Sequence, residues 1–268
     1  MKRVIKGPPP PSLSDYVTIF PEATWEDMSY DNTLGGSQVA HDCREQTISN
    51  QGGLCAYCER RISSEEPLHR RIEHFHPKAD RSGVRNWDLD WGNMLAVCDG
   101  GSGSSQDEQK THPLPKNLSC DAYKDRLVQM GGLPVACEGY LLNPLDIPAF
   151  PQLFAFEKGT WCLKPDEEGC AFVDIPGNAY ETTKELVSFT INNLNLNCDR
   201  LKDLRKRLVY NVERNIKKLR ESGYKPADMP ERLVQRYFRN KWPEFFTTLR
   251  CLIGDAAEEY LASINYQG

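Results

Sequence analysis

The segment "RIEHFHPK" (residues 71–78) carries residue types that can hydrolyse a bond with the help of a metal ion. Glu73 offers a carboxylate, and His74 and His76 offer imidazoles just before Pro77. A carboxylate oxygen is the ligand that a hard divalent ion such as Mg²⁺ prefers. A neutral imidazole can accept a proton from water, because its ordinary pKa is about 6.5. The same residues also suit an ordinary polar surface strand, so spacing alone leaves both interpretations open.

The sequence also contains a candidate metal site made of cysteines. Cys55 and Cys58 form a Cys-x-x-Cys knuckle, whose two thiolates converge on one tetrahedral ion. Cys98 and Cys120 flank a Gly- and Ser-rich loop and are the expected second pair, with His112 as the substitute ligand. Four thiolates favour structural Zn²⁺. The alternative is that Cys98 and Cys120 are ordinary buried thiols. We expect that role for the other six cysteines, Cys43, Cys137, Cys162, Cys170, Cys198 and Cys251.

Closing the loop between Cys98 and Cys120 would bring Glu73, His74 and Asp121 toward one cleft. Successive strand residues point to opposite faces, so Glu73 and His74 share a site only if the strand twists or the metal lies at its end. A metal ion combined with a general base suits phosphodiester hydrolysis. Asp121 also has a simpler interpretation, as a negative charge favoured at the start of a helix.

The elements that must position these residues are short. Residues 37–51 predict a helix that Gly52 and Gly53 end. The segment "RRIEHFHP" predicts a short strand ended by Pro77, and residues 86–98 predict a strand or a strand and loop. Residues 99–118 are rich in Gly, Ser and Pro and predict a loop. Residues 119–130 predict a helix that opens with cap-type residues.

The flanking regions complete a fold that we class as α+β and mainly α. Residues 7–15 are rich in proline and predict an extended arm. The segments "FAFEKGTWCLKP" and "GCAFVDI" within residues 150–176 predict a small hairpin. Apolar residues from Leu201 to Leu219 recur every three or four positions and predict a long helix, with one or two more helices after it. We therefore expect an N-terminal arm (1–36), a metal-binding domain (37–145) and a mostly helical C-terminal domain (146–268).

Composition narrows the class of protein. The chain has 268 residues and a formal net charge of -5. It has no run of roughly 18 apolar residues that would suit a membrane span, and its basic start is not followed by an apolar stretch, so we expect a cytoplasmic protein without a membrane partner. Nine Lys or Arg stand against four Asp or Glu between positions 196 and 222, which favours a basic face there.

Taken together, "CAYC", "EHFHP", "WGNMLAVC" and "CDAYKD" resemble the HNH endonucleases, which have a ββα-metal core and a four-cysteine zinc site. In detail the motifs are similar to the HNH component of Septu-type anti-phage systems, a protein that also accompanies some retrons. The resemblance covers roughly residues 50–126. It implies that His74 is the general base, that Glu73 and Asp121 hold a divalent ion, and that Asn93 orients the His74 loop.

Two more residues have open roles. The resemblance implies that Lys124 either contacts a phosphate or only caps solvent. His76 is a second ligand, a phosphate contact or a plain surface residue, and we favour a supporting role for it. Many HNH proteins have Asp at the Glu73 position and Asn or His at the Asp121 position. A Glu and an Asp form a more negative site, which suits Mg²⁺ or Mn²⁺.

The resemblance also implies partners. They are an ATPase subunit of the ABC or SMC-like kind, nucleic acid, with DNA preferred over RNA, and a retron reverse transcriptase with its nucleic-acid product. We therefore expect a metal-dependent HNH endonuclease that acts in anti-phage defence together with the ATPase. Two alternatives stay open: a zinc-stapled binding or scaffold subunit with a degenerate active site, and a nuclease that cleaves RNA such as transfer RNA.

Overall fold

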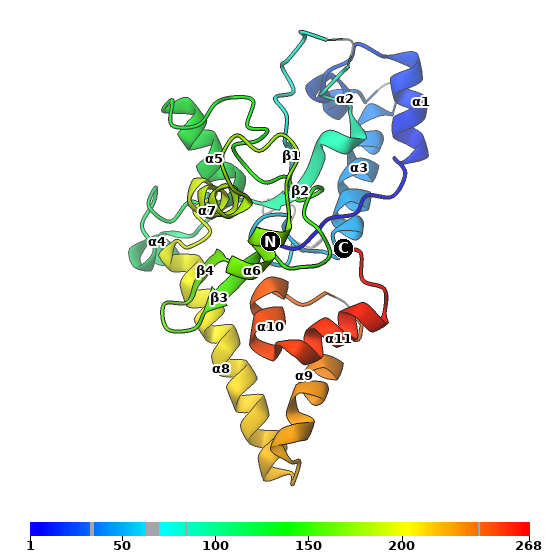
Figure 1. Ribbon diagram of the computed structural model, residues 1–268. Helices are drawn as coiled ribbons and strands as arrows, with labels where there is room; N and C mark the ends of the chain where they lie inside the picture. The colour runs from blue at the N-terminus through cyan, green and yellow to red at the C-terminus, as the bar shows by residue number, and fades with distance from the viewer. Residues whose placement is uncertain (33–34, 63–69, 84, 241) are drawn as a thin grey trace.

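The computed structural model describes residues 1–32, 35–62, 70–83, 85–240 and 242–268. This part of the chain is mainly helical and contains two small two-stranded sheets (Figure 1), which agrees with the α+β, mainly α class predicted from the sequence. The helices and strands are, in chain order, α1 (Pro11–Ile19), α2 (Trp25–Tyr30), α3 (Gly36–Asn50), β1 (Arg70–His74), η2 (Trp91–Asn93), β2 (Met94–Cys98), α4 (Gln106–Thr111), α5 (Cys120–Gln129), β3 (Phe154–Glu157), β4 (Cys162–Pro165), α6 (Glu167–Phe172), α7 (Thr183–Asn193), α8 (Asp199–Glu221), η3 (Pro226–Asp228), α9 (Met229–Tyr237), α10 (Phe246–Ile253) and α11 (Asp255–Ser263).

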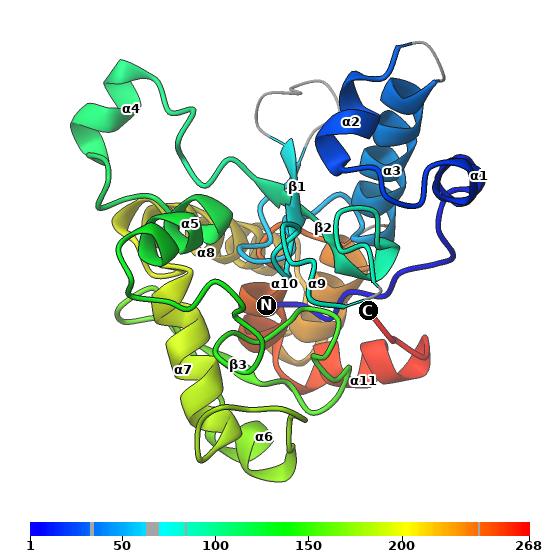
Figure 2. The same ribbon diagram turned by 90° about the horizontal axis from the view of Figure 1, so that it is seen from above.

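The centre of the molecule is the antiparallel pair of β1 and β2. Their register places Arg70 opposite Cys98 and Glu73 opposite Leu95. Every residue of β2 is buried, because α3 packs against it and α5 contacts it as well. In both views α1, α2 and α3 lie on one side of this pair, and α5 and α7 lie on the other (Figures 1 and 2). A fully buried strand explains why "MLAVC" reads as a continuous apolar run.

The N-terminal region differs from its prediction. The extended conformation expected over residues 7–15 is wrong from Pro11 onward, where α1 begins. Proline at the first position of a helix costs no hydrogen bond, because that N–H has no partner within the helix in any case. Leu13 and Tyr16 are buried in a cluster that also contains Met28 and Val39. The packing of this apolar face therefore decides the conformation.

Two further local predictions need correction. The loop expected over residues 99–118 contains α4, which Ser105 and Glu108 start with a capping box. The hairpin expected at residues 150–176 is present, but both of its strands, β3 and β4, come from "FAFEKGTWCLKP". Most of the "GCAFVDI" segment is helical instead, because the Asp166 side chain accepts a hydrogen bond from the Gly169 N–H and caps α6.

The C-terminal helices pack back onto the first half of the chain. The long α8 follows the predicted apolar stripe and projects away from the rest, with α9 beside its far end (Figure 1). Three helices, α9, α10 and α11, follow where we expected one or two. The Phe245 N–H donates to the Glu59 main-chain oxygen at 3.0 Å, and the Thr247 N–H donates to the Glu59 carboxylate at 2.9 Å.

One buried apolar cluster includes residues from Met1 to Phe245. The proposed domain limits at 36 and 145 therefore stay a prediction. Among the described residues, no helix combines the length with the apolar character that crossing a bilayer requires.

The burial of β2 generates a prediction for stability. Leu95 is fully buried, so Leu95→Ala should lower the free energy of unfolding by about 2–5 kcal/mol, because the shorter side chain leaves a cavity in the packing around β2. The exposed Ile19 of α1 provides the control: Ile19→Ala should change it by less than about 0.5 kcal/mol. Urea unfolding at a fixed zinc concentration measures both. Equal effects of the two substitutions would contradict the packing described for β2.

Candidate active site and metal centres

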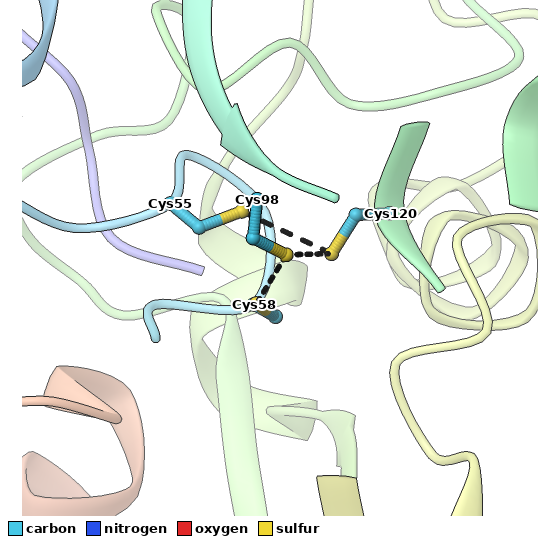
Figure 3. Close-up of side chains that lie close together, drawn as sticks. All are labelled: Cys55, Cys58, Cys98 and Cys120. Atoms are coloured by element: carbon cyan, nitrogen blue, oxygen red, sulfur yellow. Dashed lines mark hydrogen bonds between the residues drawn. The ribbon is translucent and has the colours of Figure 1, made fainter. Parts of the chain in front are cut away.

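The four cysteines of the predicted zinc site lie together. The Sγ atoms of Cys55, Cys58, Cys98 and Cys120 all lie within 4.8 Å of one another, and all four residues are buried (Figure 3). Every cysteine of the chain is a free thiol, so no disulfide competes for these sulfurs. His112, the substitute ligand, lies elsewhere: its Nε2 is 2.9 Å from a carboxylate oxygen of Asp203.

The spacing of the sulfurs fits zinc. The Sγ–Sγ distances are 3.6 Å for Cys58 and Cys98, 3.8 Å for Cys98 and Cys120, and 3.9 Å for Cys55 and Cys120. A tetrahedral ion with Zn–S bonds of about 2.3 Å requires S–S edges of about 3.8 Å. The Gly100 N–H points at the Cys98 sulfur at 3.4 Å, a contact that stabilises a thiolate. The cluster can therefore bind a metal ion, and a closed four-thiolate set favours a structural role.

Local backbone structure explains how the cluster forms. The Cys55 N–H donates to the Arg60 oxygen at 2.8 Å, which closes the knuckle turn, and the Ala56 N–H ties this turn to β2 through the Ala96 oxygen at 3.0 Å. Cys98 is the last residue of β2, and Cys120 is the first residue of α5. The metal cluster thus joins three separate segments of the chain.

A carboxylate pair lies next to this cluster. Glu73 of β1 and Asp121 of α5 are both buried and line one cleft of about 290 Å³. Lys124, one turn after Asp121, forms an ion pair with Glu73 and lies 3.9 Å from Asp121 Oδ1. Lys124 is therefore a buried partner of the carboxylates and not a residue that only caps solvent. The Tyr57 hydroxyl also donates to Glu73 at 3.4 Å.

The charges of Glu73, Asp121 and Lys124 favour the binding of a further cation. Burial raises the pKa of Glu73, and the neighbouring Asp121 carboxylate raises it further, against the effect of Lys124. Burial alone lowers the pKa of Lys124, but the charges of Glu73, Cys137 and Asp121 outweigh it and raise that pKa. Among the described residues, Asp121 Oδ1 is buried without a hydrogen-bond donor. Glu73 and Asp121 thus share the one ammonium group of Lys124, and Asp121 Oδ1 has no donor in the described part of the chain. Such a pair of carboxylates suits a divalent ion.

His74 lines the same cleft from the end of β1. Its place as the last residue of the strand explains how it shares a site with Glu73, although their side chains would point to opposite faces within a regular strand. His74 Nε2 lies 2.9 Å from the main-chain oxygen of Asp88. A carbonyl oxygen only accepts hydrogen bonds, so the neutral ring carries its proton on Nε2 and its lone pair on Nδ1. Burial lowers the pKa of His74, which favours this neutral form at pH 7.

The loop after His74 is held by Asn93 and His76. The Asn93 Oδ1 accepts from the His76 N–H at 2.7 Å, and its Nδ2 donates to the main-chain oxygens of His76 and Trp87, each at 3.0 Å. The His76 ring stacks on Trp87 with centroids 3.9 Å apart, and its two nitrogens contact carboxylates of Asp80 and Glu138. His76 does not line the Glu73 cleft among the described residues. It therefore has contacts suited to supporting the loop.

Sequence reasoning missed the residues that hold His74. Asp88 is 2 % exposed, and besides its carbonyl contact with His74 it accepts from the Trp25 N–H at 3.0 Å. The Trp25 ring meets the His74 ring edge-on at 5.4 Å. Asp88 lies in the polar segment "NWDLDW", where nothing distinguishes it from its neighbours. Trp25 is far from His74 in the chain, so no local spacing could have indicated the contact.

A comparison with known proteins gives the class: the chain belongs to the HNH endonucleases, of the retron-associated type. A relative that shows this is the Escherichia coli protein described as "Retron Ec83 putative HNH endonuclease". It is 33% identical over 262 residues, which cover 94% of this chain and 93% of the relative. No family model matches the chain. The protein is therefore an endonuclease, and the predicted family is confirmed.

The cysteine cluster generates a prediction for metal content. Cys98→Ser should remove most of the bound zinc and lower the thermal midpoint by more than about 10 °C, because a buried cluster that joins three segments loses a ligand. Cys162→Ser is the matched control, since Cys162 is partly exposed and lies outside the cluster. Elemental analysis and thermal unfolding check both. Folded wild-type protein with no zinc, or Cys98→Ser protein with a full complement of it, would contradict the assignment.

Proposed function

We propose that this endonuclease hydrolyses phosphodiester bonds of nucleic acid, with DNA as the preferred substrate, in the cleft formed by Glu73, His74 and Asp121. The observation that carries the proposal is the position of the His74 ring, whose Nε2 lies 2.9 Å from the main-chain oxygen of Asp88, in the same cleft as the two buried carboxylates. We assign the β1–β2 pair and α5 to a ββα-metal core of the HNH type, in which β1 and α5 line this cleft.

In this mechanism His74 acts as the general base. The His74 Nδ1 lone pair takes a proton from water as the water oxygen forms its bond to phosphorus. The bond from phosphorus to the leaving oxygen breaks, and that oxygen takes a proton from solvent. The main-chain oxygen of Asp88 keeps the Nε2 proton in place and stabilises the imidazolium that results. Asn93 keeps the loop after His74 in one conformation through its three hydrogen bonds, so it acts as a positioning residue.

The second half of the site supplies charge. Glu73 and Asp121 are the residues that would hold Mg²⁺ or Mn²⁺, and such an ion supplies neutralisation of the charge that develops on the phosphate. Lys124 lies between the carboxylates, so we assign it first to holding their geometry and second to contact with the phosphate. The four-cysteine cluster would hold Zn²⁺ in a structural role.

The biological setting is also a proposal. We propose that the protein acts in anti-phage defence with an ATPase subunit of the ABC or SMC-like kind. The support is the resemblance of the "EHFHP" and "CDAYK" motifs to the Septu HNH component, and the word retron in the name of the relative. Co-purification of the chain with a co-expressed ATPase of this kind, in the presence and absence of ATP, tests the partner.

Substitution of the general base gives the sharpest test. His74→Ala should lower the rate of plasmid cleavage in Mg²⁺ or Mn²⁺ by about 10²–10⁴-fold, because water loses its proton acceptor. His41→Ala, an exposed histidine on α3, is the control and should cleave like the wild type. Parallel reactions on transfer RNA decide between the DNA and RNA forms of the proposal. Inert wild-type protein with the ATPase present would instead favour the scaffold alternative.

Substitution of a carboxylate tests the metal assignment separately. Asp121→Asn should raise the Mg²⁺ concentration needed for half-maximal cleavage by about tenfold or more, because it removes a charged ligand while keeping the side-chain shape. Asp125→Asn is the matched control, since Asp125 lines the same cleft on the same helix without being an assigned ligand. We expect it to shift that concentration less than threefold. The two variants should retain equal amounts of zinc, and equal shifts in Mg²⁺ requirement would remove Asp121 from the ligand set.

A further inference from the structure

A second cleft lies next to the cysteine cluster, and its lining differs in charge from that of the first. It has a volume of about 400 Å³ and is lined by three arginines, Arg60, Arg61 and Arg200, together with the loop that follows β2. We call this cleft the arginine pocket. Its two carboxylates are already bound to their own loop: Asp99 accepts from the N–H groups of Gly101 and Gly103, and Glu108 accepts from that of Ser105.

Arg200 is built into this pocket. Its side chain comes from α8, and it is only 7 % exposed. One arm of the guanidinium donates to the Gly100 oxygen at 3.0 Å and to the Ser119 hydroxyl at 2.7 Å. Gly101 has a φ of +91°, and a Cβ there would lie 2.8 Å from the Arg200 Nε. Only a glycine therefore lets the loop close over the guanidinium.

The pocket has hydrogen-bond donors left over. Within the described residues, Nη1 of Arg200 and Nε of Arg60 are buried and have no acceptor. A buried donor without an acceptor is unfavourable, and a pair of them in one cleft indicates an anionic ligand. The planar fork of a guanidinium matches the oxygens of a phosphate group. The ligand class that suits the pocket is therefore a phosphate.

Arg71 connects the arginine pocket to the candidate active site. It is exposed on β1 two residues before Glu73, so both side chains lie on the same face of the strand. Its guanidinium donates to the Ser102 hydroxyl, on the loop that lines the arginine pocket, at 2.9 Å. Cys98, which lines the pocket, pairs with Arg70, and Arg70 lies three strand residues from Glu73, or about 10 Å. Along the axis of a DNA duplex, one strand rises by about this length over three nucleotides.

We propose that the arginine pocket binds a backbone phosphate of the nucleic-acid strand, about three nucleotides from the bond cleaved beside His74. The inference rests on the proposed function for the identity of the strand. A competing role for the arginines is to balance the negative charge of the zinc–thiolate cluster, because Arg60 follows Cys58 closely and Cys98 lines the pocket. Zinc content separates the two roles.

The experiment measures binding of a short DNA duplex by fluorescence anisotropy over a range of KCl concentrations. All proteins carry His74→Ala, so that the duplex stays intact. Adding Arg60→Gln should weaken binding about tenfold and reduce the slope of log K against log salt by about 0.9, the value for one phosphate contact. Arg200→Lys keeps the charge but loses the fork, so it should weaken binding with little change in slope. Arg236→Gln, an exposed arginine on α9, is the matched control and should change neither.

Several results would overturn the proposal. One is that Arg60→Gln leaves the affinity for DNA and the salt slope unchanged. Another is that Arg60→Gln loses zinc together with DNA binding. A third is that Arg60→Gln binds inorganic phosphate more weakly but binds DNA as before. In the background that retains His74, Arg60→Gln should raise KM for DNA about tenfold and leave kcat unchanged. Cleavage with an unchanged KM would refute the pocket alone. Wild-type protein that cuts no DNA, while the His74→Ala protein still binds it through Arg60, would refute the proposed function alone.

Discussion

The closure of four thiols around one point is the constraint on which the rest of the site depends. Cys55 and Cys58 follow α3, Cys98 ends β2 and Cys120 begins α5, so the cluster fixes how three segments meet. Asp121 takes its place because it follows Cys120, and Glu73 takes its place because β1 is paired in register with the strand that ends at Cys98. The backbone of Cys120 has a φ of 55°, a conformation that is rare outside glycine. Residues in such sparsely populated conformations cluster at ligand-binding and catalytic sites.

The two buried carboxylates beside the cluster are unfavourable for the stability of the fold, and the proposed function gives a reason for their presence. Glu73 and Asp121 are nearly inaccessible to water and share one ammonium, that of Lys124. Burying like charges together is unfavourable, and proteins retain such groups where the charge serves chemistry. The arginine pocket has the opposite charge: among the residues that the structure describes, two of its buried guanidinium nitrogens have no hydrogen-bond acceptor. The two clefts have separate linings, so one fold carries a region that favours cations and another that favours anions.

The sequence was sufficient for the elements whose signals are local. Two glycines ended α3, a proline followed β1, and the apolar stripe of α8 predicted the helix along its whole length. Cys55 and Cys58 were found because the Cys-x-x-Cys spacing is a local signal, and Cys98 and Cys120 because they flank one loop. The structure departs from the prediction where the deciding contacts are distant. The helix at Pro11 depends on packing against α2 and α3. The helix α4 is a different case, because its capping box is local but lies in a Gly- and Ser-rich segment whose composition favoured a loop. The contacts of the His74 ring were hidden because Asp88 and Trp25 approach it from separate parts of the chain.

The contacts around the His74 ring have a consequence for how this catalytic unit is inherited and engineered. The ring rests against Trp25, the Trp25 main chain is held by Asp88, and Asn86 donates to the main-chain oxygens of Pro21 and Ala23. Residues that precede the cysteine knuckle by some thirty positions thus support the His74 ring. A fragment limited to the HNH motifs would keep the proposed metal ligands and lose these contacts. The segment with the HNH motifs is therefore not sufficient by itself. Fusing this nuclease to another protein requires that the N-terminal helices be included.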